Sequence, residues 1–563
     1  MSPLNVPQAD RDSILVPPAL ARGFRRITWD GLAVALFVAV FVIILTTFPD
    51  YGVTWDEDVH NWYGVAVLDY YLTGFRDTSS LHYLDLFNYG AAFDMAAAAL
   101  NKVSPFGNYE TRHLLDALTG LLGIVGTWKL GRQLGGPRTG FLAALFLTLI
   151  PNYYGQMFNN PKDIPFAAGM AWSLYYIVRL MPQLPRPDWR PVVKLGLATG
   201  LALAVRVGGL LILGYLGLAL MAFVLWHFAE NRRFGRAAAD SWECFWRVLA
   251  PVALVAYPVM LFFWPWAQQD PLINPVKALI YFSHEIFPFR TLFAGEYVPA
   301  SDLPWEYLPT YILLALPELV LLLLLAAPMV AFLGLKRSGW RTERSEAIGW
   351  FVLGFAILFP VGYAVAIKAV LFDGMRHFIF VLPLIACVAA LIADRAADWL
   401  NASRLRGYAY AALAVYGLIH VSIMARLHPD EYVYYNAFVG GTRGAQGLFK
   451  LDYWANSYAE DVQALENHLR AEYGGDFMDH DFTVFACGPP ISAAYYFPPN
   501  FIFTQDRDNA EFIIAFTKDE CHKAVPGKEI YRVERMGTLL SVVLDRRAIL
   551  AHAPRGPAIA GVN

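Results

Sequence analysis

Carboxylates and cations gather in four short segments that interrupt otherwise apolar sequence. The first is the run TWDEDVH at positions 54–60, in which Asp56 and Glu57 are adjacent. Adjacent carboxylates can serve as a general base for a hydroxyl group, orient that group or bind a divalent ion. The same run also suits a helix N-terminus, because acidic side chains there interact favourably with the helix dipole. Both interpretations, catalytic and structural, stay open for this run.

The second segment is the run NNPKDIP at positions 159–165, which contains Lys162 and Asp163. Asp163 is expected to cap the helix that follows, with Pro165 in its first turn. Capping and catalysis are compatible roles for this carboxylate.

The other two segments hold cations at predicted helix junctions. They are the run ALAVRVGG with Arg206, and the run DGMRH with Arg376 and His377. Arginine presents a fork of N–H donors that suits phosphate oxygens. Arginines that face paired carboxylates therefore suggest a phosphate-bearing, lipid-linked substrate. Each arginine alone could instead extend toward lipid headgroups.

The elements that must position these segments are membrane helices. Of the 563 residues, 57% are hydrophobic and 16% are charged, whereas a soluble domain usually carries about 25% charged residues. The net charge of −3 comes without a basic block and so gives no footprint for nucleic acid. Four cysteines without a CxxC pattern exclude a disulfide-dense scaffold. The composition predicts a polytopic protein embedded in a lipid bilayer.

About eleven segments approach the roughly 20 apolar residues that a membrane helix needs. We expect these helices at residues 29–48, 112–134, 139–156, 164–180, 191–205, 208–228, 248–266, 308–335, 347–370, 378–393 and 407–424. Lys and Arg collect in every second loop, which places those loops and the N-terminus in the cytoplasm. The four segments with carboxylates and cations then lie on the outer face of the membrane. Two long outer loops are expected at 49–110 and 267–307.

The composition changes after residue 424 to a polar, mixed-charge region. An odd number of helices places residues 425–563 on the outer side of the membrane. Helical periodicity at 461–473 and β-rich runs at 482–486, 512–516 and 539–544 predict an exported α/β domain. An oxidising compartment would allow Cys487 and Cys521 to form a disulfide. Two free buried thiols fit equally well.

The chain resembles membrane-embedded glycosyltransferases of the GT-C fold. The run WDEDVH is similar to the acidic motif of the protein O-mannosyltransferases, with one inserted residue that makes Asp58 a rival for either acidic role. The run NPKDIPF resembles the second acidic site of bacterial members, including the aminoarabinose transferases. The runs LPWEYLP, GMRH, HPDEY and DYW, the last three within residues 374–454, are similar to bacterial proteins grouped with that family. The order and sidedness of these short motifs carry the resemblance over nearly the whole chain.

The resemblance implies an all-α bundle of GT-C type, a polyprenyl-phosphate sugar as donor, and an inverting single displacement on the periplasmic face of a bacterial inner membrane. Asp56 would accept the proton of the acceptor hydroxyl, with Glu57 or Asp163 orienting the nucleophile. The donor phosphate would be bound by Arg206, Arg376, His377 and Lys162. The acceptor stays open between a protein, a glycolipid and a polysaccharide.

Two further groups of residues are weaker candidates. Trp305 and Tyr307 could contact sugar or phosphate, and could equally anchor the chain at the membrane interface. His60 or His284, with a carboxylate such as Glu57, could bind a divalent metal ion. For either histidine, the better expectation is a side chain at the membrane interface whose hydrogen-bonding groups have partners. Metal dependence stays open.

Two other classes of protein are alternatives. A lipid or sugar transporter or flippase would also be polytopic, but it would place ionisable residues near the bilayer midplane, often in repeated halves. The sequence has no convincing internal repeat, and its charges lie in outer loops. A non-catalytic envelope-assembly protein would use the exported domain and would not need acidic and basic clusters from four loops.

Overall fold

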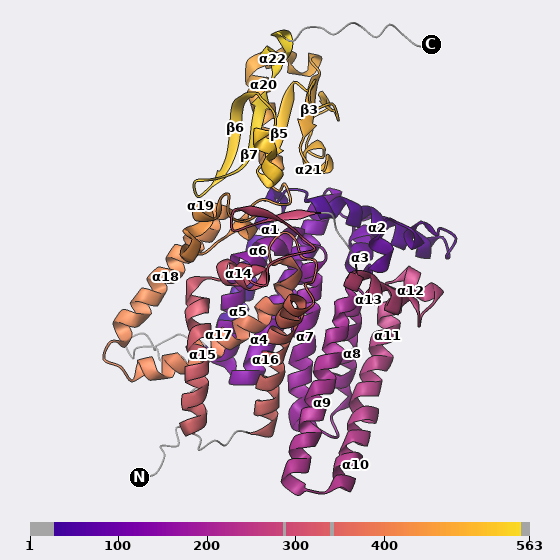
Figure 1. Ribbon diagram of the computed structural model, residues 1–563, viewed down its shortest axis with the longest axis vertical. Coiled ribbons are helices and arrows are strands. Elements are labelled where there is room, and N and C mark those ends of the chain that lie inside the picture. Colours follow the sequence, from indigo (N-terminus) through magenta and orange to yellow (C-terminus); the bar gives the residue numbers. More distant parts are fainter. Residues whose placement is uncertain (1–27, 285–288, 338–342, 553–563) are drawn as a thin grey trace.

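The chain folds into a helical bundle with a β-sheet domain at one end (Figure 1). This computed structural model describes residues 28–284, 289–337 and 343–552. The N-terminal stretch predicted to be cytoplasmic lies outside the described residues. Within the described ranges, nine helices are long and apolar enough to cross a membrane. The chain is therefore a multi-pass membrane protein.

All eleven segments predicted from hydropathy contain helices. The helices of the bundle are α1 (Trp29–Thr47), α4 (Asn108–Gly135), α5 (Pro137–Thr148), α6 (Pro151–Asn159), α7 (Asp163–Leu180), α8 (Trp189–Leu203), α9 (Leu210–Asn231), α10 (Phe234–Cys244), α11 (Ala250–Phe262), α14 (Tyr307–Ala315), α15 (Glu318–Arg337), α16 (Arg344–Ala366), α17 (Leu382–Asn401) and α18 (Arg406–Leu427). Because α5, α6 and α8 are short, the regions predicted at 139–156 and 191–205 are not among the nine.

Three predicted spans were wrong in being continuous, and a proline lies at each break. In the span predicted at 248–266, α11 ends at Phe262 and a new helix starts at Pro265. Helix α5 ends before Pro151, which starts α6, and α14 ends before Pro317, which precedes α15. Proline has no N–H to donate and its ring clashes with the preceding helical turn, so a helix ends before it or restarts with it. At the break between α14 and α15, the Asn436 side-chain amide donates hydrogen bonds of 2.7 and 2.9 Å to the carbonyls of Leu313 and Leu316.

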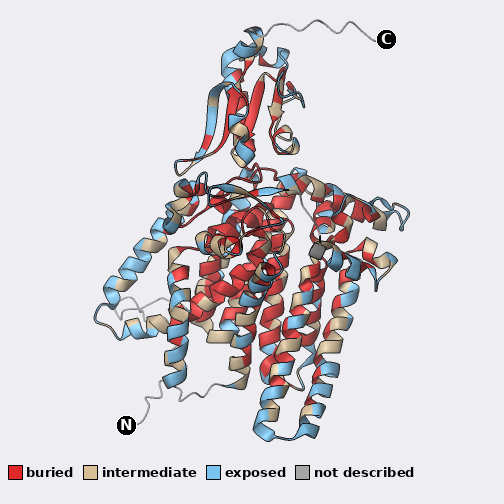
Figure 2. Cartoon of the chain, in the orientation of Figure 1, coloured by how far each residue is buried: buried red, intermediate tan, exposed pale blue. Residues whose placement is uncertain are grey.

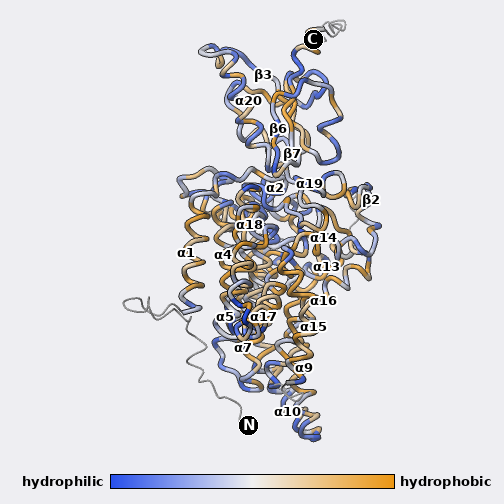
Figure 3. The backbone as a smooth tube through the Cα atoms, turned by 90° about the vertical axis from the view of Figure 1, so that its left-hand side faces the viewer, coloured by the Kyte–Doolittle hydropathy of each residue, from blue (hydrophilic) through white to orange (hydrophobic). Residues whose placement is uncertain are grey.

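The core of the bundle lies around α4, α7 and α17, whereas the outer helices expose apolar side chains. Buried residues concentrate at the centre of the bundle (Figure 2), and apolar residues continue along its length (Figure 3). On α18, for example, Leu418 is 72% exposed. Such a surface is unfavourable in water, and the acyl chains of a bilayer would cover it.

Short elements form a layer between the bundle and the β-sheet domain. The two long loops predicted at 49–110 and 267–307 contain α2 (Trp55–Leu72), α3 (Ala92–Asn101), α12 (Pro265–Gln269), α13 (Asn274–His284) and a hairpin of β1 (Arg290–Phe293) and β2 (Glu296–Pro299). We call this end of the bundle, which carries the sheet, the domain end (Figure 1).

The C-terminal domain is an α/β fold, as predicted. Its sheet has the order β4-β3-β5-β7-β6, with β3 (Phe482–Ala486), β4 (Phe501–Phe503) and β5 (Phe512–Phe516) parallel and β6 (Lys528–Arg535) and β7 (Thr538–Asp545) antiparallel to their neighbours. Helix α20 (Tyr458–Tyr473) packs against it. The predicted runs match β3, β5 and most of β7. Strands β4 and β6 were missed because both are edge strands, one short and the other largely charged and exposed. Cys487 and Cys521 form a disulfide with Cα atoms 6.5 Å apart.

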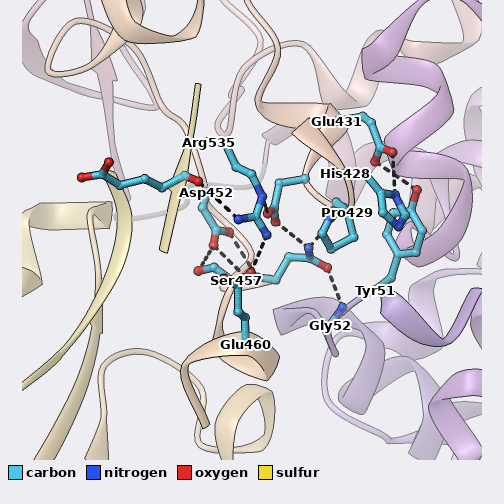
Figure 4. Close-up of polar contacts among 12 residues, drawn as sticks. Tyr51, Gly52, His428, Pro429, Glu431, Asp452, Ser457, Glu460 and Arg535 are labelled. Atoms are coloured by element: carbon cyan, nitrogen blue, oxygen red, sulfur yellow. Dashed lines mark hydrogen bonds and ion pairs between the residues drawn. The ribbon is translucent and has the colours of Figure 1, made fainter. Parts of the chain in front are cut away.

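A buried polar network fixes the domain to the bundle (Figure 4). Arg535, the last residue of β6, pairs with Asp430 at 3.0 Å and Glu460 at 2.6 Å. The Asn456 side chain donates to Asp430 at 2.6 Å and accepts from the backbone N–H of Gly52, just after α1, at 2.8 Å. Asp430 is fully buried, and a buried charge without such partners would be strongly destabilising. The network therefore holds the sheet in one position over the domain end.

Candidate active site

A cavity of about 1230 Å³ lies at the domain end of the bundle. All four segments singled out in the sequence contribute to its wall. The predicted site residues that line it are Asp56, Lys162, Arg206, Arg376 and His377. The helices α7, α9 and α16 supply apolar lining residues, among them Phe166, Leu211, Phe359 and Tyr363. The cavity thus joins a charged region to an apolar one.

Asp56 and Arg376 form an ion pair in this cavity. Asp56 lies in the first turn of α2, and Arg376 starts the 3-10 helix η8 (Arg376–Val381) that leads into α17. Their Oδ2 and Nη1 atoms are 2.7 Å apart. Burial opposes ionisation of Asp56, but the positive charges of Arg376 and Lys162 outweigh it and lower the pKa of the carboxyl. Asp56 is therefore ionised at neutral pH.

A second ion pair joins Asp163 to Arg206, which lies between α8 and α9. The two side chains approach to 2.5 Å. Asp163 is the first residue of α7 and not its cap. Instead, Asn160 accepts a hydrogen bond of 3.0 Å from the backbone N–H of Asp163 and donates one of 3.0 Å to its carboxylate. The predicted capping role thus belongs to Asn160, and the Asp163 carboxylate is directed to the arginine.

Lys162 and His377 are the other two predicted site residues in the cavity wall. The Lys162 ammonium lies 4.3 Å from the ring centre of Tyr89. Burial lowers the pKa of Lys162 to about 8, and the charge of Asp56 partly opposes this effect. His377 is packed against Phe372 with ring centres 4.9 Å apart. The cavity wall therefore holds the cations of Lys162, Arg206 and Arg376 together with the Asp56 carboxylate.

Glu57 does not line the cavity, although it is adjacent to Asp56. Its carboxylate accepts a hydrogen bond of 2.9 Å from the backbone N–H of Thr54, which completes a capping box at the start of α2. The other oxygen lies 3.0 Å from His113. The Asp58 carboxylate accepts a 2.6 Å hydrogen bond from Tyr109. Of the three consecutive acidic residues, the structure directs Asp56 alone into the cavity.

The two aromatic candidates lie in different environments. Trp305 is 72% exposed and is not part of the cavity wall. Tyr307 is buried, and its hydroxyl accepts a 3.2 Å hydrogen bond from the backbone N–H of Gly374. Tyr307 therefore supports the loop that carries Arg376 and does not face the cavity.

The candidate metal ligands are not assembled in the described part of the chain. His60 lies with its Nδ1 2.7 Å from Asp94, which also pairs with Arg112 at 2.6 Å. Among the residues that the structure describes, no group of three or more His, Cys, Asp or Glu side chains is placed to hold a metal ion. The side chain of His284, the last residue of α13, lies outside the described part. Of the three candidate ligands, Glu57 and His60 are engaged by other side chains, and a metal site that includes His284 stays a prediction.

Several residues that line the cavity were not among the site residues predicted from the sequence. Trp55, Asp373, Tyr453, Trp454 and Lys518 also line the wall. Trp55 and Asp373 belong to two of the acidic and basic segments, and the DYW run was noted for its resemblance alone. No sequence motif marks Lys518 as a cavity residue, because it is an isolated lysine in the C-terminal domain. It reaches the cavity through the docking of that domain.

Comparisons with known proteins agree with the predicted family resemblance. Residues 94–262 match the family model described as Dolichyl-phosphate-mannose-protein mannosyltransferase, a segment that includes Lys162, Asp163 and Arg206. No curated protein matches the chain.

Two solved structures are similar to it at low identity. The crystal structure of ArnT from Cupriavidus metallidurans bound to undecaprenyl phosphate has a TM-score of 0.47 and 15% identity, over 93% of this chain and 99% of that chain. The Archaeoglobus fulgidus oligosaccharyltransferase in the apo form has a TM-score of 0.44 and 13% identity, over 80% of this chain and 62% of that chain.

Proposed function

We propose that this chain is an integral membrane glycosyltransferase that transfers a sugar from a polyprenyl-phosphate donor to an acceptor hydroxyl. The family match over residues 94–262 supports glycosyl transfer. The observation that carries the proposal is the Asp56–Arg376 pair, which lies beside Lys162 and Arg206 in a cavity with an apolar wall. A potential base and a potential phosphate site are thereby adjacent.

The donor fits the two regions of the cavity. Phe166, Leu211 and Phe359 would contact the polyprenyl chain, and Arg206 and Arg376 would bind its phosphate. The Nε atoms of both arginines have no hydrogen-bond partner among the described residues. These N–H groups remain available for phosphate oxygens, to which arginine donates in a bidentate manner. Lys162 and His377 would add further donors.

The reaction is a single displacement with inversion at the anomeric carbon. Asp56 takes the proton of the acceptor hydroxyl while the hydroxyl oxygen forms a bond to the anomeric carbon. The bond from that carbon to the phosphate oxygen breaks, and polyprenyl phosphate leaves with the electron pair. Arg206 and Arg376 neutralise the charge that develops on the phosphate. Asp163 holds Arg206 in place.

Donor binding would also activate the base. The charges of Arg376 and Lys162 outweigh the effect of burial, lower the pKa of the Asp56 carboxyl and make it a weak proton acceptor. A bound phosphate would share these cations. The pKa of Asp56 would then rise toward its ordinary value, so that the base becomes effective only after the donor has arrived.

The orientation in the membrane follows from the loops. Basic residues such as Arg232 and Arg233 lie between α9 and α10, at the end of the bundle away from the sheet domain (Figure 1). The positive-inside rule places that end in the cytoplasm. We therefore assign the protein to a bacterial inner membrane, residues 1–424 to the membrane domain and residues 425–563 to a periplasmic domain. The acceptor is a protein, a glycolipid or a polysaccharide of the envelope.

Reconstitution tests the proposal. The full-length protein in vesicles would receive an undecaprenyl-phosphate sugar with a labelled sugar, and an envelope extract as acceptor. We expect label in the extract and release of undecaprenyl phosphate. Arg186→Gln serves as a control, because this arginine pairs with Glu243 outside the cavity. Movement of intact donor across the vesicle membrane without sugar transfer would support a flippase and overturn the proposal.

A further inference from the structure

The C-terminal domain contributes a lysine to the cavity wall. Lys518 follows β5 and starts the 3-10 segment η12 (Lys518–Lys523). Its Nζ is 3.6 Å from the Asp373 carboxylate and 3.4 Å from the carbonyl oxygen of Tyr453. It also lies 4.8 Å from the ring centre of Trp55, the neighbour of Asp56. A single residue of the sheet domain thus contacts three segments that form the cavity.

The backbone of η12 is held in an unfavourable conformation. Asp519 and Glu520 have φ angles of +54° and +56°, a region that side chains with a Cβ rarely adopt. Such residues concentrate at functional sites, where surrounding contacts hold them. Here the Asp519 carboxylate accepts a 3.0 Å hydrogen bond from Lys450, and Cys521 is joined to Cys487. Both anchors keep the segment at the cavity.

The residues that line the cavity come from two parts of the chain. Helices α9 and α16 supply apolar lining residues such as Leu211 and Phe359, whereas Trp55 starts α2 and Tyr453 and Lys518 belong to the C-terminal region. In a single displacement, the acceptor oxygen approaches the anomeric carbon from the side opposite the departing phosphate, and its alignment controls the rate. If the donor occupies the apolar region, the acceptor occupies the region under the sheet domain.

We propose that Lys518 is an acceptor-binding residue and that η12 forms the acceptor side of the active site. This inference rests on the proposed function. A lysine ammonium has three N–H donors. One of them donates to the Tyr453 carbonyl, and the Asp373 carboxylate lies 3.6 Å from the ammonium as an ion pair. A further donor is available for an oxygen of the acceptor near its reacting hydroxyl. The ring of Trp55, which is 39% exposed, offers a neighbouring surface for stacking.

Separate measurements of acceptor and donor affinity test this role. The reconstituted full-length protein would be titrated with envelope extract at saturating donor, and undecaprenyl phosphate binding would be measured independently. We expect Lys518→Met to raise the extract concentration for half-maximal transfer about tenfold, because a hydrogen bond from a charged donor is lost. The affinity for undecaprenyl phosphate should stay unchanged. Lys518→Arg should restore most of the acceptor affinity.

Lys523→Met is the matched control, since Lys523 ends the same segment, pairs with Glu520 and does not line the cavity. The Cys487→Ser, Cys521→Ser double variant should weaken acceptor affinity in the same direction as Lys518→Met. Equal loss of undecaprenyl phosphate binding in Lys518→Met would place Lys518 on the donor side and overturn the inference. An unchanged extract concentration for half-maximal transfer in Lys518→Met would also overturn the inference. Failure of the unsubstituted protein to bind undecaprenyl phosphate would instead overturn the proposed function.

Discussion

Asp56 and Arg376 are separated by 320 positions in the sequence, and their side chains meet at 2.7 Å in the cavity. The arginine side chain is 7% exposed and the aspartate 22% exposed, so water screens the pair only in part. The guanidinium also lies 4.8 Å from the ring centre of Phe372 and 5.5 Å from that of Trp454. In the proposed reaction, a base and a phosphate ligand thus neutralise each other until the donor binds.

Replacing the base should abolish most of the transfer. Asp56→Asn keeps the shape of the side chain but cannot accept a proton, so we expect the transfer rate to fall by about 10²–10⁴-fold, the range for general-base catalysis. The rate of label transfer into the envelope extract measures this. Asp58→Asn is the matched control, because Asp58 is bonded to Tyr109. Full activity in Asp56→Asn would show that another group accepts the proton.

Removing either arginine should weaken binding of the lipid phosphate. Arg206→Gln and Arg376→Gln each remove a charged donor, and we expect the Kd for undecaprenyl phosphate to rise about tenfold or more. Binding to the protein in nanodiscs gives this value. Arg186→Gln should leave the Kd unchanged, because its partner Glu243 is not part of the cavity wall. An unaltered Kd in both cavity variants would contradict the assignment of the phosphate site.

The sequence predicts the helices and the four segments well because hydropathy and flanking charge are local signals. The family resemblance gives the proton to Asp56 and an orienting role to Glu57, but the sequence does not show that Asp56 alone faces the cavity. Adjacent residues on a helix point in directions about 100° apart, so the first residue of α2 decides which carboxylate faces the cavity. Lys518 was not predictable either, since its position depends on the docking of the sheet domain. The breaks at Pro151 and Pro317 were visible in the sequence but were outweighed by continuous hydropathy.

Glu57 should matter more for stability than for transfer. Glu57→Ala would leave the Thr54 N–H and His113 without their partner, and we expect a loss of about 1–3 kcal/mol in the free energy of unfolding. Glu57→Gln preserves the capping box, in which glutamine serves as well as glutamate. It should therefore retain most of the transfer activity. Thermal unfolding and the transfer assay together check both variants. Loss of transfer in a stable Glu57→Gln protein would instead support a catalytic role.

Binding of the lipid phosphate should depend on pH through Lys162. Burial lowers the pKa of this lysine to about 8. Above that pH it loses its charge, so the affinity for undecaprenyl phosphate should fall between pH 7 and 9.5. Lys162→Arg should remove this dependence, because arginine stays protonated throughout this range. A decline of the same size in both proteins would assign the titration to another group.

The stability of the protein should depend on pH through His428, at the end of α18. Its Nδ1 lies 2.9 Å from Glu431 and its Nε2 lies 3.0 Å from Asp50, just after α1. Burial opposes protonation, but these two carboxylates outweigh it and raise the pKa of His428 from 6.5 to about 9.

Because the folded pKa exceeds the unfolded one, the stabilisation is complete below pH 6.5 and is lost as the pH rises through 9. Its size below pH 6.5 should be about 2 kcal/mol, since Asp50 is half exposed and partly screened. His428→Gln should therefore lower the midpoint of thermal unfolding most at pH 6, with a difference that disappears above pH 9. A difference that stays constant over this range would mean that His428 contributes through packing against Tyr51, whose ring centre is 5.3 Å away, and not through its charge.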